Sequence, residues 1–114
     1  MVKYTNERIM QLLKLYIKRL NKKFKLEKVI LFGSRARGDY LINSDIDLIV
    51  VSKDFESIPF RKRMSEAIED WSGEIDIEVL CYTPEEFKRK MKEIGIINIA
   101  VKEGIKILEK SHRK

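Results

Sequence analysis

The residues best suited to chemistry lie in one short stretch, from Gly33 to Asp47. The pair Gly33-Ser34 follows an apolar run, and ten residues separate Ser34 from Asp45. Asp45 and Asp47 then lead into a second apolar run. A Gly-Ser turn can offer backbone N–H groups and a hydroxyl to phosphate, whereas paired carboxylates can hold divalent metal ions. The stretch therefore indicates a site that handles a nucleotide through its phosphates.

The loop that begins at Gly33 supplies the phosphate end of this expected site. Arg35 and Arg37 carry guanidinium groups, whose forked donors suit phosphate oxygens. At least one of these arginines can instead be paired with surface acids. The loop lacks the Gly-x-x-x-x-Gly-Lys-Ser/Thr pattern, so it is not a P-loop.

The aspartates supply the metal end. Because side chains alternate along a strand, Asp45 and Asp47 share one face. Two neighbouring carboxylates without a cation would repel each other, and Mg²⁺ removes that repulsion. An isolated Asp-x-Asp is more often a solvated strand end, but the Gly-Ser turn upstream favours a site for one or two Mg²⁺ ions.

A third carboxylate is expected from the segment 74–81, which alternates polar and apolar residues as a half-exposed strand does. Glu74, Asp76 and Glu78 share one face of this strand. Asp76 is central and is the first choice to complete a carboxylate triad beside residues 45–52, and Glu78 is the second. At least one of the three is expected on the wet face of the sheet.

The elements that must position these residues follow from periodicity and from turn signals. Apolar residues at helical spacing predict a first helix, and Thr83-Pro84-Glu85-Glu86 forms a capping box that opens a later one. Gly95 and Gly104 weaken the prediction of the last helix. The expected elements are a helix over 5–21, a strand over 26–32, a helical turn over 34–38, a strand over 45–52, a helix over 59–71, a strand over 74–81, a helix from 84 and a helix over 95–109.

Length and composition set the outer limits. A chain of 114 residues, 44% hydrophobic and 37% charged, suits one globular domain over 1–114. No run is long enough to cross a bilayer. A single cysteine cannot form an internal disulfide, so a reducing cytoplasm is the simplest location. The net charge of +6 arises from interleaved Lys and Glu, which suit heat adaptation as well as a nucleic-acid surface.

The motif Gly-Ser-Arg-Ala-Arg-Gly-Asp over 33–39, followed by Asp-x-Asp, resembles the signature of the DNA polymerase β-like nucleotidyltransferase superfamily. In so short a chain it is most similar to the minimal nucleotidyltransferases. The resemblance implies an α/β (α+β) fold, with a mixed β-sheet flanked by helices and a polymerase β-like palm.

The resemblance also implies the roles of the residues. The Gly33 backbone and Ser34 would hold the terminal phosphates of ATP, and Asp45 and Asp47 would bind two Mg²⁺ ions. Asp76 would help to bind one metal ion and could activate the incoming nucleophile. The reaction would be in-line attack of a hydroxyl on the α-phosphate, with release of pyrophosphate.

Minimal nucleotidyltransferases commonly stand beside a small all-helical partner of the HEPN class. The resemblance therefore implies an antitoxin that transfers AMP from ATP to a tyrosine of this partner. Two alternatives stay open, namely transfer to a small molecule or RNA and neutralisation of a partner by contact alone. The isoleucine-rich segment 94–107 is either buried in the core or offers a surface to the helical partner or to a second copy of the chain.

Overall fold

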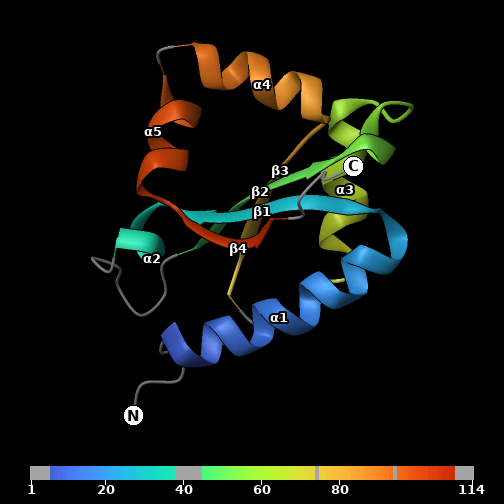
Figure 1. Cartoon of the computed structure of the whole chain (residues 1–114). Coiled ribbons are helices and arrows are strands. Elements are labelled where there is room, and N and C mark those ends of the chain that lie inside the picture. Colours follow the sequence, from blue (N-terminus) through green and yellow to red (C-terminus); the bar gives the residue numbers. More distant parts are fainter. Residues whose placement is uncertain (1–5, 38–44, 74, 94, 110–114) are drawn as a thin grey trace.

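The computed structural model describes residues 6–37, 45–73, 75–93 and 95–109. Four strands and five α-helices follow one another along this part of the chain (Figure 1). In order they are α1 (Asn6–Lys23), β1 (Leu26–Phe32), α2 (Ser34–Arg37), β2 (Ile46–Ser52), a 3₁₀ turn η1 (Lys53–Phe55), α3 (Phe60–Ile68), β3 (Ile77–Tyr82), α4 (Pro84–Lys92), α5 (Ile96–Glu103) and β4 (Ile105–Glu109).

The strands form one mixed sheet in the order β3-β2-β1-β4. β1 pairs antiparallel with both β2 and β4, whereas β2 and β3 run parallel. The parallel pair needs a crossover, which α3 provides, and the antiparallel β1–β2 pair is joined through α2. The expected fold class, a small α+β domain with a mixed sheet flanked by helices, is confirmed.

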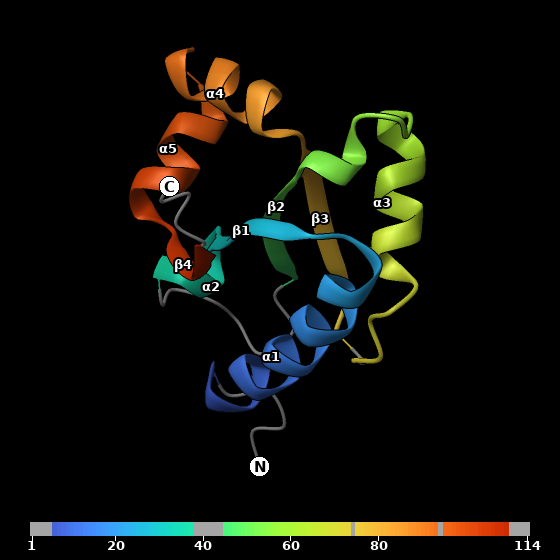
Figure 2. The same cartoon turned by 45° about the vertical axis from the view of Figure 1, so that its right-hand side comes forward.

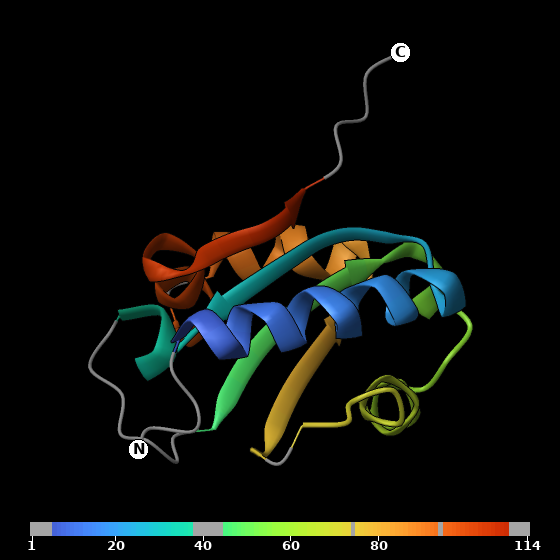
Figure 3. The ribbon, with the colours of Figure 1, turned by 90° about the horizontal axis from the view of Figure 1, so that it is seen from below.

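The helices lie on both faces of the sheet. α1 covers one face and α4 with α5 covers the other, which Figures 1 and 3 show from two directions. Successive residues of β1 accordingly enter different cores: Val29 and Leu31 pack under α1, whereas Ile30 packs toward α4 and α5. The same alternation places Leu48 on the α1 face and Ile49 on the other.

α3 lies beside β3 at one edge of the sheet (Figure 2). Its position is fixed by Arg63, which is 5% exposed. The Arg63 Nη1 donates to the Cys81 carbonyl at 3.2 Å and to Glu86 Oε1 at 2.6 Å, and its Nε donates to the Ile58 carbonyl at 2.7 Å. One buried guanidinium therefore ties α3 to β3 and to the start of α4.

Most predicted elements match the structure within a few residues, and β1 matches exactly. The predicted capping box is present, because the Thr83 hydroxyl accepts from the Glu86 N–H and Glu86 accepts from the Thr83 N–H. The predicted helix over 95–109 is wrong in its second half. The helix ends at Glu103, and residues 105–109 form β4, paired with β1. Gly104 ends the helix, and the apolar residues beyond it gain a strand partner.

The isoleucine-rich segment was predicted to be either buried in the core or exposed on the surface, and the structure shows residues of both kinds. Ile97, a residue of α5, is buried in the core between the sheet and the helices α4 and α5. Ile105, in contrast, is 42% exposed. Ile94 lies outside the described residues. Within the described ranges, none of the helices has the length and apolar character needed to span a membrane.

Candidate active site

Gly33 forms the turn between β1 and α2. Its φ of +77° lies in the left-handed region, where L-residues with a side chain are strained. A Cβ at this position would lie 2.5 Å from Asp47 Oδ2. Glycine is therefore required twice here, for its backbone conformation and because the Asp47 carboxylate lies directly against it. Gly33 and Asp47, the two ends of the predicted motif, are fourteen positions apart in sequence and meet at this contact.

Asp47 lies between two neighbouring strands. In the sheet register it is opposite Phe32 of β1 on one side and Glu78 of β3 on the other. Its side chain is half-buried, on the sheet face that α4 and α5 cover. Asp45 is exposed and precedes the first residue of β2 by one position. The common face of Asp45 and Asp47 stays a prediction, because Asp45 lies outside the strand.

Three carboxylates interact at this end of the sheet. Burial raises the pKa of Asp47, and the negative charges of Glu78 and Asp45 raise it further. The folded protein therefore disfavours the ionised form of Asp47 when no cation is near. A positive charge placed among these groups would reverse that effect, since it favours ionised carboxylates.

The structure places the two candidates for the third carboxylate differently. Glu78 lies directly opposite Asp47, whereas Asp76 lies just before β3, where its carbonyl accepts from the Ile46 N–H at 3.0 Å. Both side chains are exposed, and both line a pocket with Asp45. Asp76 and Glu78 thus stay candidates, and Glu78 is the one with a charge interaction with Asp47.

The arginines of the loop do not share one environment. Arg35 is only 1% exposed and interacts within the fold, so it is part of the packed structure behind the loop. The side chains of Ser34 and Arg37 lie outside what the structure describes, although their backbone forms α2. The Ala36 N–H donates to the Gly33 carbonyl at 3.1 Å, which closes the turn.

The donor set suits a divalent cation shared with a substrate. In the part of the chain that is described, no three Asp, Glu, His or Cys side chains are gathered closely enough to form a complete ligand shell. Mg²⁺ commonly takes only one or two carboxylates and completes its shell with water and substrate phosphates. The mutual repulsion at Asp47 is what such an ion would relieve, so the residues present fit it.

A pocket next to the carboxylates was not predicted. It has a volume of about 420 Å³ and lies between α3 and β3. Its helix wall comes from positions 61, 64, 65 and 68, which form one stripe at helical spacing. The sequence contains that stripe, but only the crossover position of α3 shows that it faces the acidic end of β3.

The comparisons with known proteins agree with this geometry. The family model "Nucleotidyltransferase domain" matches residues 13–110. "Putative protein adenylyltransferase MJ0141" of Methanocaldococcus jannaschii is 34% identical over 70 residues, which make up 61% of this chain and 68% of that protein.

Two solved structures share the fold. The first, "Crystal structure of a putative nucleotidyltransferase from Sulfolobus solfataricus", is 33% identical with a TM-score of 0.62, over 74% of this chain and 75% of that one. The second, "Crystal structure of the toxin-antitoxin with AMP-PNP", is 20% identical with a TM-score of 0.52, over 83% of this chain and 72% of that one. The family model covers most of this chain, and Gly33 lies directly against Asp47 at one end of the sheet, so this chain belongs to the nucleotidyltransferase domain family.

Proposed function

We propose that this nucleotidyltransferase moves AMP from ATP to a tyrosine of a small helical partner of the HEPN class, and so acts as an antitoxin in the cytoplasm. The observation that carries the proposal is the contact of Gly33 with the Asp47 carboxylate, because it brings a phosphate-binding turn and the acidic residues together. A relative at 34% identity bears the name of a protein adenylyltransferase, which supports a protein as acceptor.

In this reaction the residues of the loop hold the triphosphate. The Gly33 backbone and the Ser34 hydroxyl bind the terminal phosphates, and Arg37 is a further donor to them. Arg35, being buried, acts by holding the loop in shape. Asp45 and Asp47 are the metal ligands, with Asp76 or Glu78 as the third carboxylate. When bound, Mg²⁺ offsets the charge of the phosphate oxygens and of the carboxylates.

The chemical step is a substitution at the α-phosphorus. The phenolic oxygen of the acceptor tyrosine forms a bond to this phosphorus, and the bond to the bridging oxygen of pyrophosphate breaks. Pyrophosphate leaves with the bonding electron pair, and the phenolic proton passes to the third carboxylate. Holding the two reactants in line supplies much of the rate enhancement.

The test uses the helical protein encoded by the neighbouring gene. The two proteins are incubated with α-labelled ATP and Mg²⁺, and the partner is examined by gel and by intact mass. We expect the partner to gain AMP, and Asp47→Asn to abolish this gain. Glu85→Gln is the matched control, since it exchanges an exposed carboxylate at the start of α4 for an amide. An unlabelled partner, or equal labelling by Asp47→Asn, would contradict the proposal.

A further inference from the structure

The pocket between α3 and β3 opens beside the candidate catalytic carboxylates. Asp45, Asp76 and Glu78 are part of its lining. The rest of the lining is Arg61, Met64, Ser65 and Ile68 from α3 with Ile77 and Val79 from β3. The pocket therefore shares carboxylates with the site and adds an apolar wall that the site itself lacks.

The direction of an in-line reaction indicates which substrate the pocket receives, and this step rests on the proposed function. The attacking and leaving oxygens lie on opposite sides of the reacting phosphorus. Pyrophosphate leaves on the side of Gly33, which follows β1. β3 is separated from β1 by β2, so the pocket at the outer side of β3 lies on the opposite side, from which the acceptor must come.

The charges of the pocket agree with this direction. Three carboxylates, from Asp45, Asp76 and Glu78, face one guanidinium, from Arg61, which gives a formal charge of −2. When no metal ion is bound, such a lining disfavours phosphate groups, and its carboxylate oxygens can accept a hydrogen bond from a neutral hydroxyl. The apolar wall suits a ring, so a phenol, apolar along its body and polar at its tip, matches both parts.

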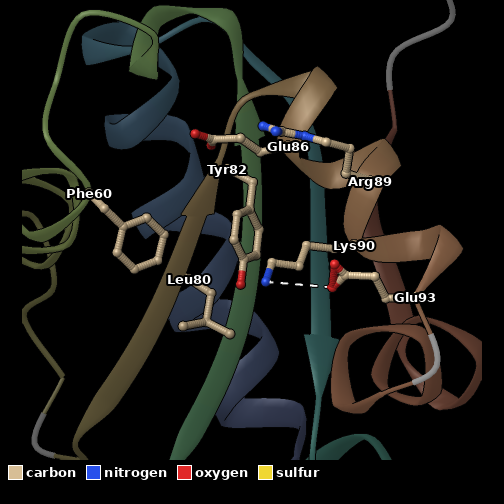
Figure 4. Close-up of a pocket in the computed structure, with 7 residues that line it drawn as sticks. All are labelled: Phe60, Leu80, Tyr82, Glu86, Arg89, Lys90 and Glu93. Atoms are coloured by element: carbon tan, nitrogen blue, oxygen red, sulfur yellow. Dashed lines mark ion pairs between the residues drawn. The ribbon is translucent and has the colours of Figure 1, made fainter.

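A second hollow lies farther along β3, next to the first pocket. It has a volume of about 590 Å³ and lies over Leu80 and Tyr82, between the start of α3 and the helix α4 (Figure 4). Phe60 is 41% exposed there, and its ring lies 5.8 Å from that of Tyr82. Ile77 and Val79 of the first pocket pack on the α1 side of the sheet, whereas Leu80 and Tyr82 pack on the α4 side. Because β3 is an edge strand, a polypeptide leaving the first pocket can pass around this edge to reach them.

We infer that the pocket between α3 and β3 binds the side chain of the acceptor tyrosine, with its hydroxyl toward Glu78 and Asp45. The residues that flank this tyrosine lie over Phe60 in the second hollow. A polypeptide thus uses two adjoining sites, whereas a small-molecule acceptor needs only the first.

The first test fills the pocket. Ser65→Leu adds an apolar side chain at an exposed helix position where leucine is a good helix former. Lys62→Leu is the matched control, because Lys62 is exposed on the same helix and does not line the pocket. We expect Ser65→Leu to lower AMP transfer to the partner about 10- to 100-fold, the range for a pocket that no longer fits its side chain. The Kd for ATP should stay unchanged.

The second test needs no transfer. With the methionine methyl groups labelled with ¹³C, N-acetyl-L-tyrosinamide at millimolar concentration should shift the Met64 signal and leave Met10 and Met91 in place. Phe60→Ala should keep this shift, yet raise the KM for the protein partner about tenfold, as loss of one apolar anchor does. The Tm of each variant shows that it is folded.

The outcomes separate the two proposals. Transfer by Ser65→Leu at the rate of Lys62→Leu, or an unmoved Met64 signal, would overturn the acceptor pocket. Loss of ATP affinity in step with loss of transfer would also overturn it, because the pocket would then hold the nucleobase. Wild-type protein that binds ATP and leaves the partner unlabelled would overturn the proposed function, and the Met64 signal would still decide the pocket.

Discussion

Replacing Gly33 by alanine should damage activity far more than stability. The backbone at φ +77° costs about 1–2 kcal/mol for a residue with a Cβ. The new Cβ would lie 2.5 Å from Asp47 Oδ2, so the carboxylate must turn away. Turning a side chain away from its rotamer costs about 0.5–1.5 kcal/mol. Together these lower the Tm by roughly 6–14 °C, at roughly 4 °C per kcal/mol for a domain of this size.

The effect on transfer follows from the displaced carboxylate. A misplacement of ~1 Å at a catalytic group can cost ~10²-fold in rate. We therefore expect Gly33→Ala to lose AMP transfer by about that factor at a temperature where it is still folded. The assay is AMP transfer to the partner, with the Tm measured by circular dichroism. Gly95→Ala is the control, because Gly95 is extended at φ 172° and a Cβ there meets nothing within 4 Å.

A double-mutant cycle isolates the clash from the backbone cost. In an Asp47→Ala background the carboxylate is gone, so Gly33→Ala should cost only the backbone part. The coupling free energy between the two positions should then be about 0.5–1.5 kcal/mol. Zero coupling, or Gly33→Ala with normal transfer, would refute the argument that Gly33 makes room for Asp47.

Three further substitutions test other parts of the structure. Asp47→Asn should raise the Tm of the metal-free protein at neutral pH while abolishing transfer, because the fold disfavours the ionised carboxylate, and a lower Tm would contradict this. Glu86→Gln should destabilise by about 1.5–3 kcal/mol at neutral pH. The hydrogen bond from Arg63 lowers the pKa of Glu86, so this contribution is present above the ordinary pKa of 4.5 and is lost as pH falls through the lowered pKa. Urea titrations of the variant and the wild type should therefore converge in acid. Gly73→Ala should cost about 1–3 kcal/mol and shift the emission of the single tryptophan, because its Cβ would overlap the Trp71 ring, and unchanged emission would refute it.

The parts of the fold that could be predicted are those with strong local signals. Gly33 marks the end of β1, and the capping box at Thr83 marks the start of α4. These two boundaries were therefore visible in the sequence. β4 was not, because five residues with apolar positions fit the end of a helix as well as an edge strand. Its partner, β1, is more than seventy residues away, and such pairing leaves no local signal.

The same limit applies to the site. Alternation placed Asp45 and Asp47 on one face, but it could not say which acid of the next strand lies opposite Asp47, because register depends on pairing between strands. The structure puts Glu78 there, whereas Asp76 precedes β3 and lines the neighbouring pocket. The burial of Arg35 could not be predicted either, because the sequence around a buried arginine in this loop is the same as around an exposed arginine that binds phosphate.

The order of strands in the sheet also determines when the site is completed during folding. Phe32 and Asp47 are partners in an antiparallel pair of neighbours, so the turn at Gly33 and the first carboxylates can assemble through contacts close in sequence. Glu78 arrives only when β3 docks in parallel after its crossover through α3, a pairing of longer range. Recovery of AMP transfer after dilution from denaturant would therefore mark the docking of β3, and not the earlier closure of the β1–β2 pair.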